Sequence, residues 1–205
     1  MGKGAAAVLA RLVKAQALAG SRPAEAIELL EKICRKQPRN ADAWFMRGTV
    51  LGNSGRFAEA VDCLQRAVEL RPDHVLSYFN LGNAFSGLGA FGDAAMAFSD
   101  ALRLDSGRPE IMRALAHAEV NSGRPAAAAR VYADYLQLRP QDPEVYGNLG
   151  SCHFHLGELE AAARCYRQAL ALKQDAAWFD GLGAALCQQG DHEAAIAAHR
   201  AAVRL

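Results

Sequence analysis

A period of 34 residues runs through this sequence and limits its possible folds more than any other feature. Three residue columns keep this period, with one step of 33 residues near the end of the chain. The glycine column is Gly55, Gly89, Gly123, Gly157 and Gly190. The alanine column is Ala26, Ala60, Ala94, Ala128, Ala162 and Ala195. The proline column is Pro38, Pro72 and Pro140. Columns that share one period predict tandem copies of a single unit, which bury a core by stacking on one another.

Each unit has the pattern of two helices joined by a tight turn. Apolar residues recur at helical spacing on both sides of each column glycine, as Trp44, Leu51 and Leu64 do around Gly55. A glycine between two helices predicts a left-handed helix end, where a side chain costs about 1 to 2 kcal/mol. Proline after the second helix cannot continue it and ends the unit. We call the first helix of each hairpin helix A and the second helix B.

Small residues indicate where the two helices of a hairpin meet. The alanine column lies in helix B, and a second small column lies in helix A. This second column is Gly48, Gly82, Ala116, Gly150 and Gly183. Small side chains let antiparallel helices approach closely. The large apolar residues between them then fill a core that one hairpin alone cannot enclose.

Together these columns resemble the signature of the tetratricopeptide repeat (TPR), and the stretch from Ala41 to His74 matches it nearly everywhere. The resemblance covers almost the whole chain. It implies an all-α fold, a right-handed α-solenoid of six TPR helix-turn-helix hairpins in a single array over residues 1–205. The repeats fall at residues 7–40, 41–74, 75–108, 109–142, 143–175 and 176–205.

The two end units depart from the pattern. In the first, Lys14 and Ser21 replace the two expected glycines, and a polar first helix suits a terminal cap. The last repeat stops at Leu205 inside helix B and is incomplete, which predicts an exposed apolar face. We therefore expect either a longer protein of which this is the N-terminal part, or end-to-end self-association through the uncapped C-terminal repeat.

The resemblance also implies that helix A of each unit lines a concave groove in which a peptide or protein segment binds. The groove positions of helix A predict a peptide-binding site. Its residues are Phe45, Thr49, Asn53, Leu76, Phe79, Asn80, Asn83, Arg113, His117, Asn121, Asn148, Ser151 and His155. The expected function is that of a protein–protein interaction scaffold.

Two units, around Asn80 and Asn148, further resemble the asparagine-bearing units of bacterial O-GlcNAc-transferase-like and TPR-sulfotransferase N-terminal superhelices. An amide side chain offers a donor and an acceptor to a peptide backbone. Met46, Ala114 and Gly181 interrupt this column, and asparagines that only solvate the surface explain it equally well. The alternative function is a substrate-recruiting N-terminal arm of a larger glycosyltransferase or sulfotransferase.

Composition argues against several other classes. Lys and Arg number 23 against 22 Asp and Glu, a net charge of +1, so neither nucleic acid nor an anionic membrane is expected as a partner. No apolar stretch reaches the roughly 20 residues of a membrane span. The five cysteines are scattered without a C-x-x-C pair, which indicates a reducing, cytoplasmic setting.

The sequence contains no convincing catalytic or metal-binding pattern. Cys152, His153, His155 and Cys165 have metal-ligating side chains. However, His153 and His155 lie two residues apart on a helix and point in opposite directions, and Cys165 falls at a packing position. Neither a G-x-S-x-G motif nor a phosphate-binding loop occurs. We therefore expect no enzyme activity in this chain, no cofactor and no metal.

Overall fold

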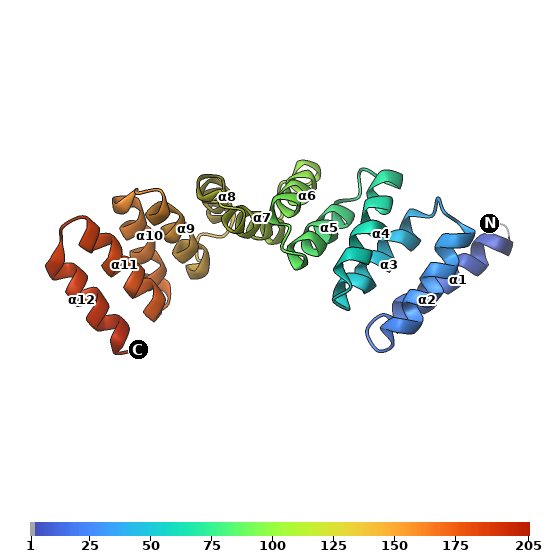
Figure 1. Cartoon of the computed structure of the whole chain (residues 1–205), viewed down its shortest axis with the longest axis horizontal. Coiled ribbons are helices and arrows are strands. Elements are labelled where there is room, and N and C mark those ends of the chain that lie inside the picture. Colours follow the sequence, from blue (N-terminus) through green and yellow to red (C-terminus); the bar gives the residue numbers. More distant parts are fainter. Residues whose placement is uncertain (1–2) are drawn as a thin grey trace. The chain divides into compact units, whose positions relative to one another are not determined.

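A computed structural model describes residues 3–205, which are helical apart from short turns (Figure 1). In this part of the chain twelve helices pack as consecutive antiparallel hairpins. They are α1 (Lys3–Leu18), α2 (Pro23–Lys36), α3 (Ala41–Asn53), α4 (Phe57–Leu70), α5 (Val75–Gly87), α6 (Phe91–Leu104), α7 (Pro109–Asn121), α8 (Pro125–Leu138), α9 (Pro143–His155), α10 (Leu159–Leu172), α11 (Ala176–Gln188) and α12 (His192–Val203). The predicted all-α class with its six hairpins is confirmed.

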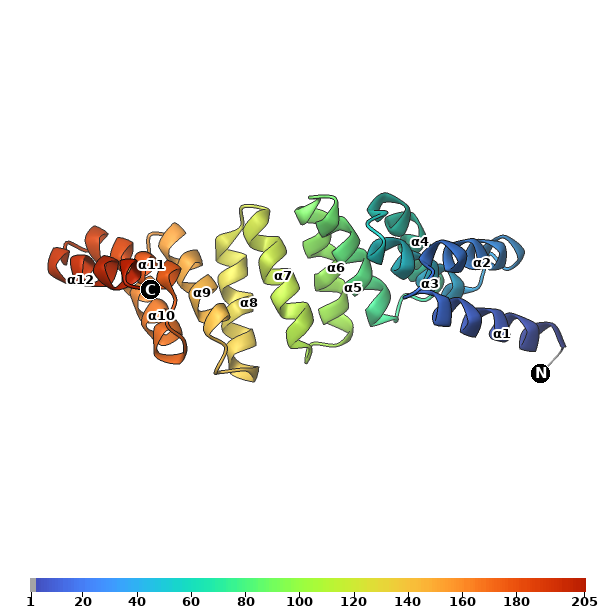
Figure 2. The same ribbon diagram turned by 90° about the horizontal axis from the view of Figure 1, so that it is seen from below.

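The hairpins form two compact units, Met1–Gly107 with α1 to α6 and Arg108–Leu205 with α7 to α12. Within each unit every helix packs on the next one along the chain, and Figure 2 shows these neighbours side by side. In the first unit α3 also contacts α5, and in the second α9 contacts α11. In these two pairs helix A of one hairpin lies beside helix A of the next. We call the surface formed by the A helices of a unit the helix A surface.

The glycine column has the predicted left-handed conformation. Its members, Gly55, Gly89, Gly123, Gly157 and Gly190, have φ angles between 73° and 85°. No other described residue has a positive φ. At the opposite ends of the helices, side chains of Asn40, Asp142, Asp175 and Asp191 accept hydrogen bonds from main-chain N–H groups of the first turn. Turn glycines and N-caps thus fix the hairpin boundaries.

The small column of helix A meets large side chains of helix B, as predicted. A Cβ atom added to Gly48 would come within 2.6 Å of Leu64, and one added to Gly82 within 2.5 Å of Phe98. Both large side chains are almost fully buried. Each such burial contributes roughly 1.5 to 3 kcal/mol. Gly48 and Gly82 are therefore needed for close approach of the two helices in their hairpins.

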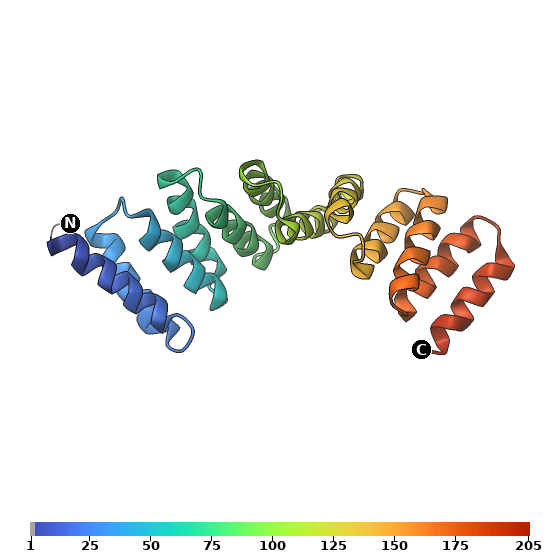
Figure 3. The ribbon, with the colours of Figure 1, turned by 180° about the vertical axis from the view of Figure 1, so that it is seen from behind.

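In the first hairpin, blue in Figure 3, the hydrogen-bonded loop that closes the turn is one residue shorter than in the other hairpins. Here Arg22 N donates to Leu18 O, four residues back. In the second hairpin the equivalent Arg56 N donates to Leu51 O, five residues back, across the left-handed Gly55. Without a left-handed residue the first turn closes with one residue fewer. Residues of α1 therefore correspond to residues 33 positions later in α3, and not 34.

This shift turns α1 by one residue, about 100° around its axis. Ala15, and not Lys14, takes the position of Gly48, and Ala15 is fully buried while Lys14 is exposed. The sequence pattern around Lys14 and Ser21 lacked glycine for this reason. The shift also changes which residues of α1 lie on the helix A surface. Separately, none of the helices within residues 3–205 is long and apolar enough to cross a membrane.

Candidate functional site

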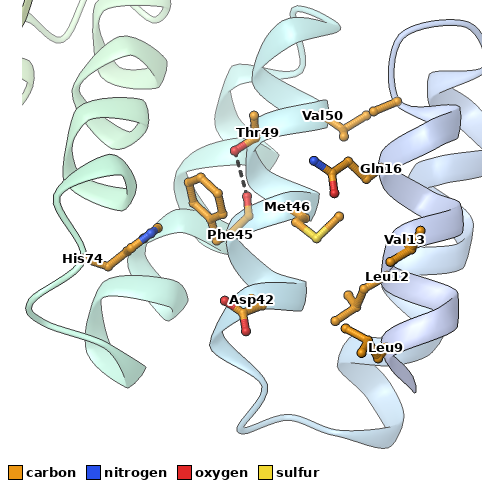
Figure 4. Close-up of a pocket in the computed structure, with 11 residues that line it drawn as sticks. Leu9, Leu12, Val13, Gln16, Asp42, Phe45, Met46, Thr49, Val50 and His74 are labelled. Carbon is orange, nitrogen blue, oxygen red and sulfur yellow. Dashed lines mark hydrogen bonds between the residues drawn. The ribbon is translucent and has the colours of Figure 1, made fainter. Parts of the chain in front are cut away.

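An open cleft of about 430 Å³ lies between α1 and α3 in the first unit (Figure 4). Its lining residues are Leu9, Leu12, Val13, Gln16, Ala19, Asp42, Phe45, Met46, Thr49, Val50 and His74. Figure 4 shows Leu9, Leu12 and Val13 pointing from α1 toward α3. Leu9 and Val13 are 57% and 59% exposed, so large apolar side chains face solvent in this hollow. We call it the apolar cleft.

The shifted register of α1 builds this cleft. Four pairs of lining residues lie 33 positions apart, one member on each helix. These pairs are Leu9 with Asp42, Leu12 with Phe45, Val13 with Met46, and Gln16 with Thr49. Equivalent positions of two neighbouring A helices therefore face the same space. Apolar side chains gathered around one hollow indicate an interaction site, whereas single exposed ones do not.

His74, at the start of α5, belongs to the polar end of the cleft. Its ring meets Phe45 edge-on at 4.8 Å between centroids, and its Nδ1 lies 2.7 Å from Ser77 Oγ. Burial lowers the pKa of His74, and the neighbouring Arg71 lowers it further, whereas Asp42 and Asp73 oppose this. The Asp42 carboxylate accepts a hydrogen bond from Arg71. The cleft therefore holds no unpaired charge at neutral pH.

A smaller pocket of about 240 Å³ shares Thr49 with the cleft. It is lined by Gly48, Thr49, Gly52, Asn53, Phe57, Leu64, Asn80, Asn83 and Ala84. Asn80 Nδ2 donates to Thr49 Oγ1 at 2.8 Å, and Thr49 Oγ1 donates to Phe45 O at 2.9 Å. Asn53 and Asn83 are exposed and have no hydrogen-bond partner among residues 7–205, whose side chains the structure describes. We call this the amide pocket, because two of its amides are free to bind a ligand.

The other residues predicted for the first unit lie on α5 outside both hollows. Leu76 is 42% exposed. Phe79 is half-buried, and its ring lies 5.8 Å from that of the core residue Phe98. Phe79 therefore contributes to packing as well as to the surface. Phe45, Thr49, Asn53, Asn80 and Asn83 are the predicted residues that the structure brings together.

The remaining predicted residues belong to the second unit. Arg113, His117 and Asn121 are exposed and follow one face of α7 at four-residue spacing. Asn121 Nδ2 donates to His117 O at 2.8 Å, so that amide is partly engaged within its own helix. The pocket between the end of α8 and the start of α9, near Pro140 and Pro143, includes none of these three residues.

On α9, two predicted residues are bonded to tyrosines from helix B. Burial raises the pKa of Tyr132 to about 12, while a hydrogen bond with Asn148 lowers it. Burial likewise raises the pKa of Tyr166, and a hydrogen bond with Ser151 lowers it. Asn148 and Ser151 thus tie the helix A surface to the core. His155 is exposed beside Phe154.

The sequence prediction missed the contribution of α1. Leu9, Leu12, Val13 and Gln16 line one side of the apolar cleft, whereas the sequence pattern predicts a polar cap for the first helix. Met46 had counted only as an interruption of the asparagine column, yet it lines the cleft. The helical spacing of Leu9, Leu12 and Val13 indicates an apolar face on the first helix. This face can be assigned to the cleft only once residues of α1 are known to correspond to residues 33 positions later in α3.

Among the side chains that the structure describes, those of residues 7–205, no group of three or more His, Cys, Asp and Glu is placed to hold a metal ion. His153 Nδ1 instead lies 2.5 Å from Glu158 Oε2. The five cysteines are free thiols. Burial raises the pKa of Cys34 to about 12 and that of Cys152 to about 11, so both remain protonated at neutral pH.

Comparison with known proteins places this geometry in context. The family model described as tetratricopeptide repeat matches residues 16–51, 45–109 and 113–177. A crystal structure of MamA is 20% identical with a TM-score of 0.72, covering 77% of this chain and 92% of that one. The structure of YrrB, described as a TPR protein with an unusual peptide-binding site, is 19% identical with a TM-score of 0.76, covering 85% and 91%. At such identities these structures show a shared fold. No curated protein sequence matches significantly.

Proposed function

The chain belongs to the tetratricopeptide-repeat family, and we propose that it is a protein–protein interaction scaffold whose first unit binds a peptide or protein segment. The apolar cleft between α1 and α3 carries this proposal. Its exposed Leu9 and Val13 face Phe45 and Met46, so a partner side chain placed there loses contact with water on both sides. Such burial contributes about 25 cal/mol per Å² of apolar surface.

The arrangement supports binding without catalysis. His74 lies beside Ser77, but Ser77 is only 1% exposed and cannot reach a bound substrate. The hydroxyl of Thr49 donates to a main-chain oxygen. The cleft therefore offers no activated nucleophile. The peptide-binding site named for YrrB supports the same kind of function in a protein of the same fold.

Two substitutions at sites of matched exposure test the proposal. Val13 in the cleft is 59% exposed and Met96 on α6, outside both hollows, is 62% exposed. Changing either residue to Lys leaves the fold intact, because neither is buried. In affinity capture from cell extract we expect Val13→Lys to lose at least about tenfold in binding, or about 1.4 kcal/mol, and Met96→Lys to bind as the wild type does. Equal capture by both variants would refute the cleft as the site.

A second candidate function is self-association through α12. Ile196 and Val203 are 52% and 87% exposed. The residues 33 positions earlier, Ala163 and Leu170 on α10, are buried, and α10 packs on α11. We propose that another copy of the chain covers the corresponding face of α12. Light scattering should show a mass that rises with protein concentration and returns to the monomer in Val203→Asp. A wild-type mass independent of concentration contradicts this candidate.

The alternative of a recruiting arm for a glycosyltransferase or sulfotransferase has no support from the family model or from the MamA and YrrB structures. It depended on the asparagine column. Asn80 and Asn148 of that column are bonded to Thr49 and Tyr132, so each has part of its amide engaged inside the protein. No feature of the described chain favours this alternative over a scaffold.

A further inference from the structure

We propose that the segment bound by the first unit is uncharged and amphipathic, with large apolar side chains against the apolar cleft and its peptide groups against the amide pocket. This inference rests on the proposed binding function of the helix A surface. It adds the chemical class of the partner. Three observations support it: the order of residues along α1 and α3, the lack of unpaired charged groups among the residues that line the two hollows, and the unpaired amides of Asn53 and Asn83.

The first observation is that the helix A surface of this unit has two rows that cross the helices. The apolar row contains Leu12, Val13, Phe45 and Met46. The polar row follows about one helical turn later, with Gln16 on α1 and Thr49 on α3. A segment lying along the rows, across α1 and α3, therefore meets apolar surface on one side and polar groups on the other.

The second observation is the charge of the two hollows. Asp42 and His74 are the ionisable residues among those that line them. Asp42 is bound by Arg71, and His74 is held in its neutral form by burial. A charged side chain placed here would give up its water without gaining a partner, which is costly. The surface therefore selects against acidic and basic segments alike.

The third observation is the hydrogen-bonding capacity next to the cleft. Asn53 and Asn83 are exposed, line the amide pocket and have no partner among the residues the structure describes. Each carboxamide can accept from a peptide N–H and donate to a peptide carbonyl. Because Thr49 borders both hollows, a segment anchored in the cleft passes these amides directly. An extended backbone uses them, whereas the backbone of a regular helix is already paired internally.

A peptide-display library of random sequence, selected on the immobilised full chain, tests this. We expect the selected peptides to be rich in Leu, Phe, Ile and Met at spaced positions and poor in Asp, Glu, Lys and Arg. Synthetic copies should bind at least about tenfold more weakly to Val13→Lys and severalfold more weakly to Asn83→Ala. Binding to Met96→Lys, a change on α6 outside both hollows, should equal that of the wild type. A Lys substituted for the apolar anchor of a selected peptide should abolish its binding.

The possible failures are distinct. Selected peptides that carry conserved acidic or basic anchors, and still lose binding to Val13→Lys, overturn the uncharged class while leaving the scaffold function standing. Peptides that bind Val13→Lys and Asn83→Ala as well as they bind wild type overturn the cleft as a binding site, and the proposed function with it. A selection that returns no peptide above background has the same consequence.

Discussion

The two units present different chemistry at equivalent positions of helix A. At one repeat position of helix A, the first unit has Phe45 on α3 and Phe79 on α5. In the second unit the same position is Arg113 on α7, Gly147 on α9 and Asp180 on α11. The helices, turns and glycine column are the same in both. The repeat therefore fixes the scaffold and leaves the helix A surface free to vary.

The difference extends into the core of each hairpin. At one position of helix B the first unit has Leu64 and Phe98, while the second has Tyr132 and Tyr166. The two tyrosine hydroxyls use up hydrogen-bonding capacity of Asn148 and Ser151 on the surface. Leu64 and Phe98 have no hydroxyl. In the first unit Asn83, at the position of Ser151, has no internal partner, whereas Asn80, at the position of Asn148, is bonded to Thr49 instead. The core residue of helix B is thus one of the contacts that determine whether a polar side chain of helix A is available.

Gly147 gives the largest expected effect. A Cβ atom there would lie 2.2 Å from Nε1 of Trp178, which leans over this position from the next hairpin and also has Lys173 5.7 Å from its ring. Gly147→Ala should displace the indole and lower the free energy of unfolding by about 1 to 3 kcal/mol. Urea unfolding followed by tryptophan fluorescence measures this, and a Trp44→Phe background leaves Trp178 as the reporter.

Gly92 on α6 is the matched control in the first unit. A Cβ atom added there meets nothing within 4 Å. Gly92→Ala should therefore raise stability by up to about 1 kcal/mol through helix propensity alone. If Gly147→Ala is as stable as Gly92→Ala, Trp178 does not restrict the size of the residue at position 147. Steric exclusion would then not explain why this position, which is Phe45 and Phe79 in the first unit, is glycine on α9.

Asn80 and Asn83 provide a smaller effect that separates packing from binding within the first unit. Asn80→Ala removes the hydrogen bond to Thr49 and should cost about 0.5 to 1.5 kcal/mol of stability. Asn83→Ala removes no internal bond and should stay within about 0.5 kcal/mol of wild type. Urea midpoints of the two variants decide this. Equal losses would mean that Asn83 also has a structural role, and the amide pocket would lose a binding group.

Much of this fold was readable from the sequence, because the repeat imposes the same constraint six times. A glycine between two helical patterns, such as Gly55 or Gly89, predicts a left-handed residue at the end of the first helix. The 34-residue period then locates each hairpin. The site was less readable. The sequence near Ser21 does not indicate that the hydrogen-bonded loop of the first turn is one residue shorter, because this depends on which main-chain carbonyl Arg22 N binds. That single residue decides whether Leu9 and Val13 face the cleft.

The availability of Asn80 and Asn148 was equally hidden from the sequence. Both have the side chain that a backbone-binding column requires. Their hydrogen bonds to Thr49 and Tyr132 come from helices that only the packed structure brings close. In the sequence, an asparagine that is hydrogen-bonded inside the protein cannot be told from one whose amide is free for a ligand. Tertiary contacts, and not pattern, distinguish Asn83 from Asn80.

His74 gives the smallest expected effect and tests whether the cleft is neutral. Burial lowers its pKa in the folded chain, with Arg71 acting in the same direction and Asp42 and Asp73 against it. The unfolded chain should titrate near the ordinary value of about 6.5. Above that pH the residue is neutral in both states and contributes nothing. Below it the unfolded chain binds the proton first, so the free energy of unfolding falls as the pH is lowered.

His74→Gln removes this proton and keeps a polar side chain. Relative to that variant, the wild type should lose urea resistance between about pH 7 and pH 5, because other titrating groups cancel in the comparison. A selected apolar peptide should also dissociate more readily from the wild type over the same range, because protonated His74 places a cation beside Phe45. If both proteins show the same pH profile, the pKa of His74 is the same in the folded and the unfolded chain. The first unit would then resemble the charged second unit more closely than its lining residues indicate.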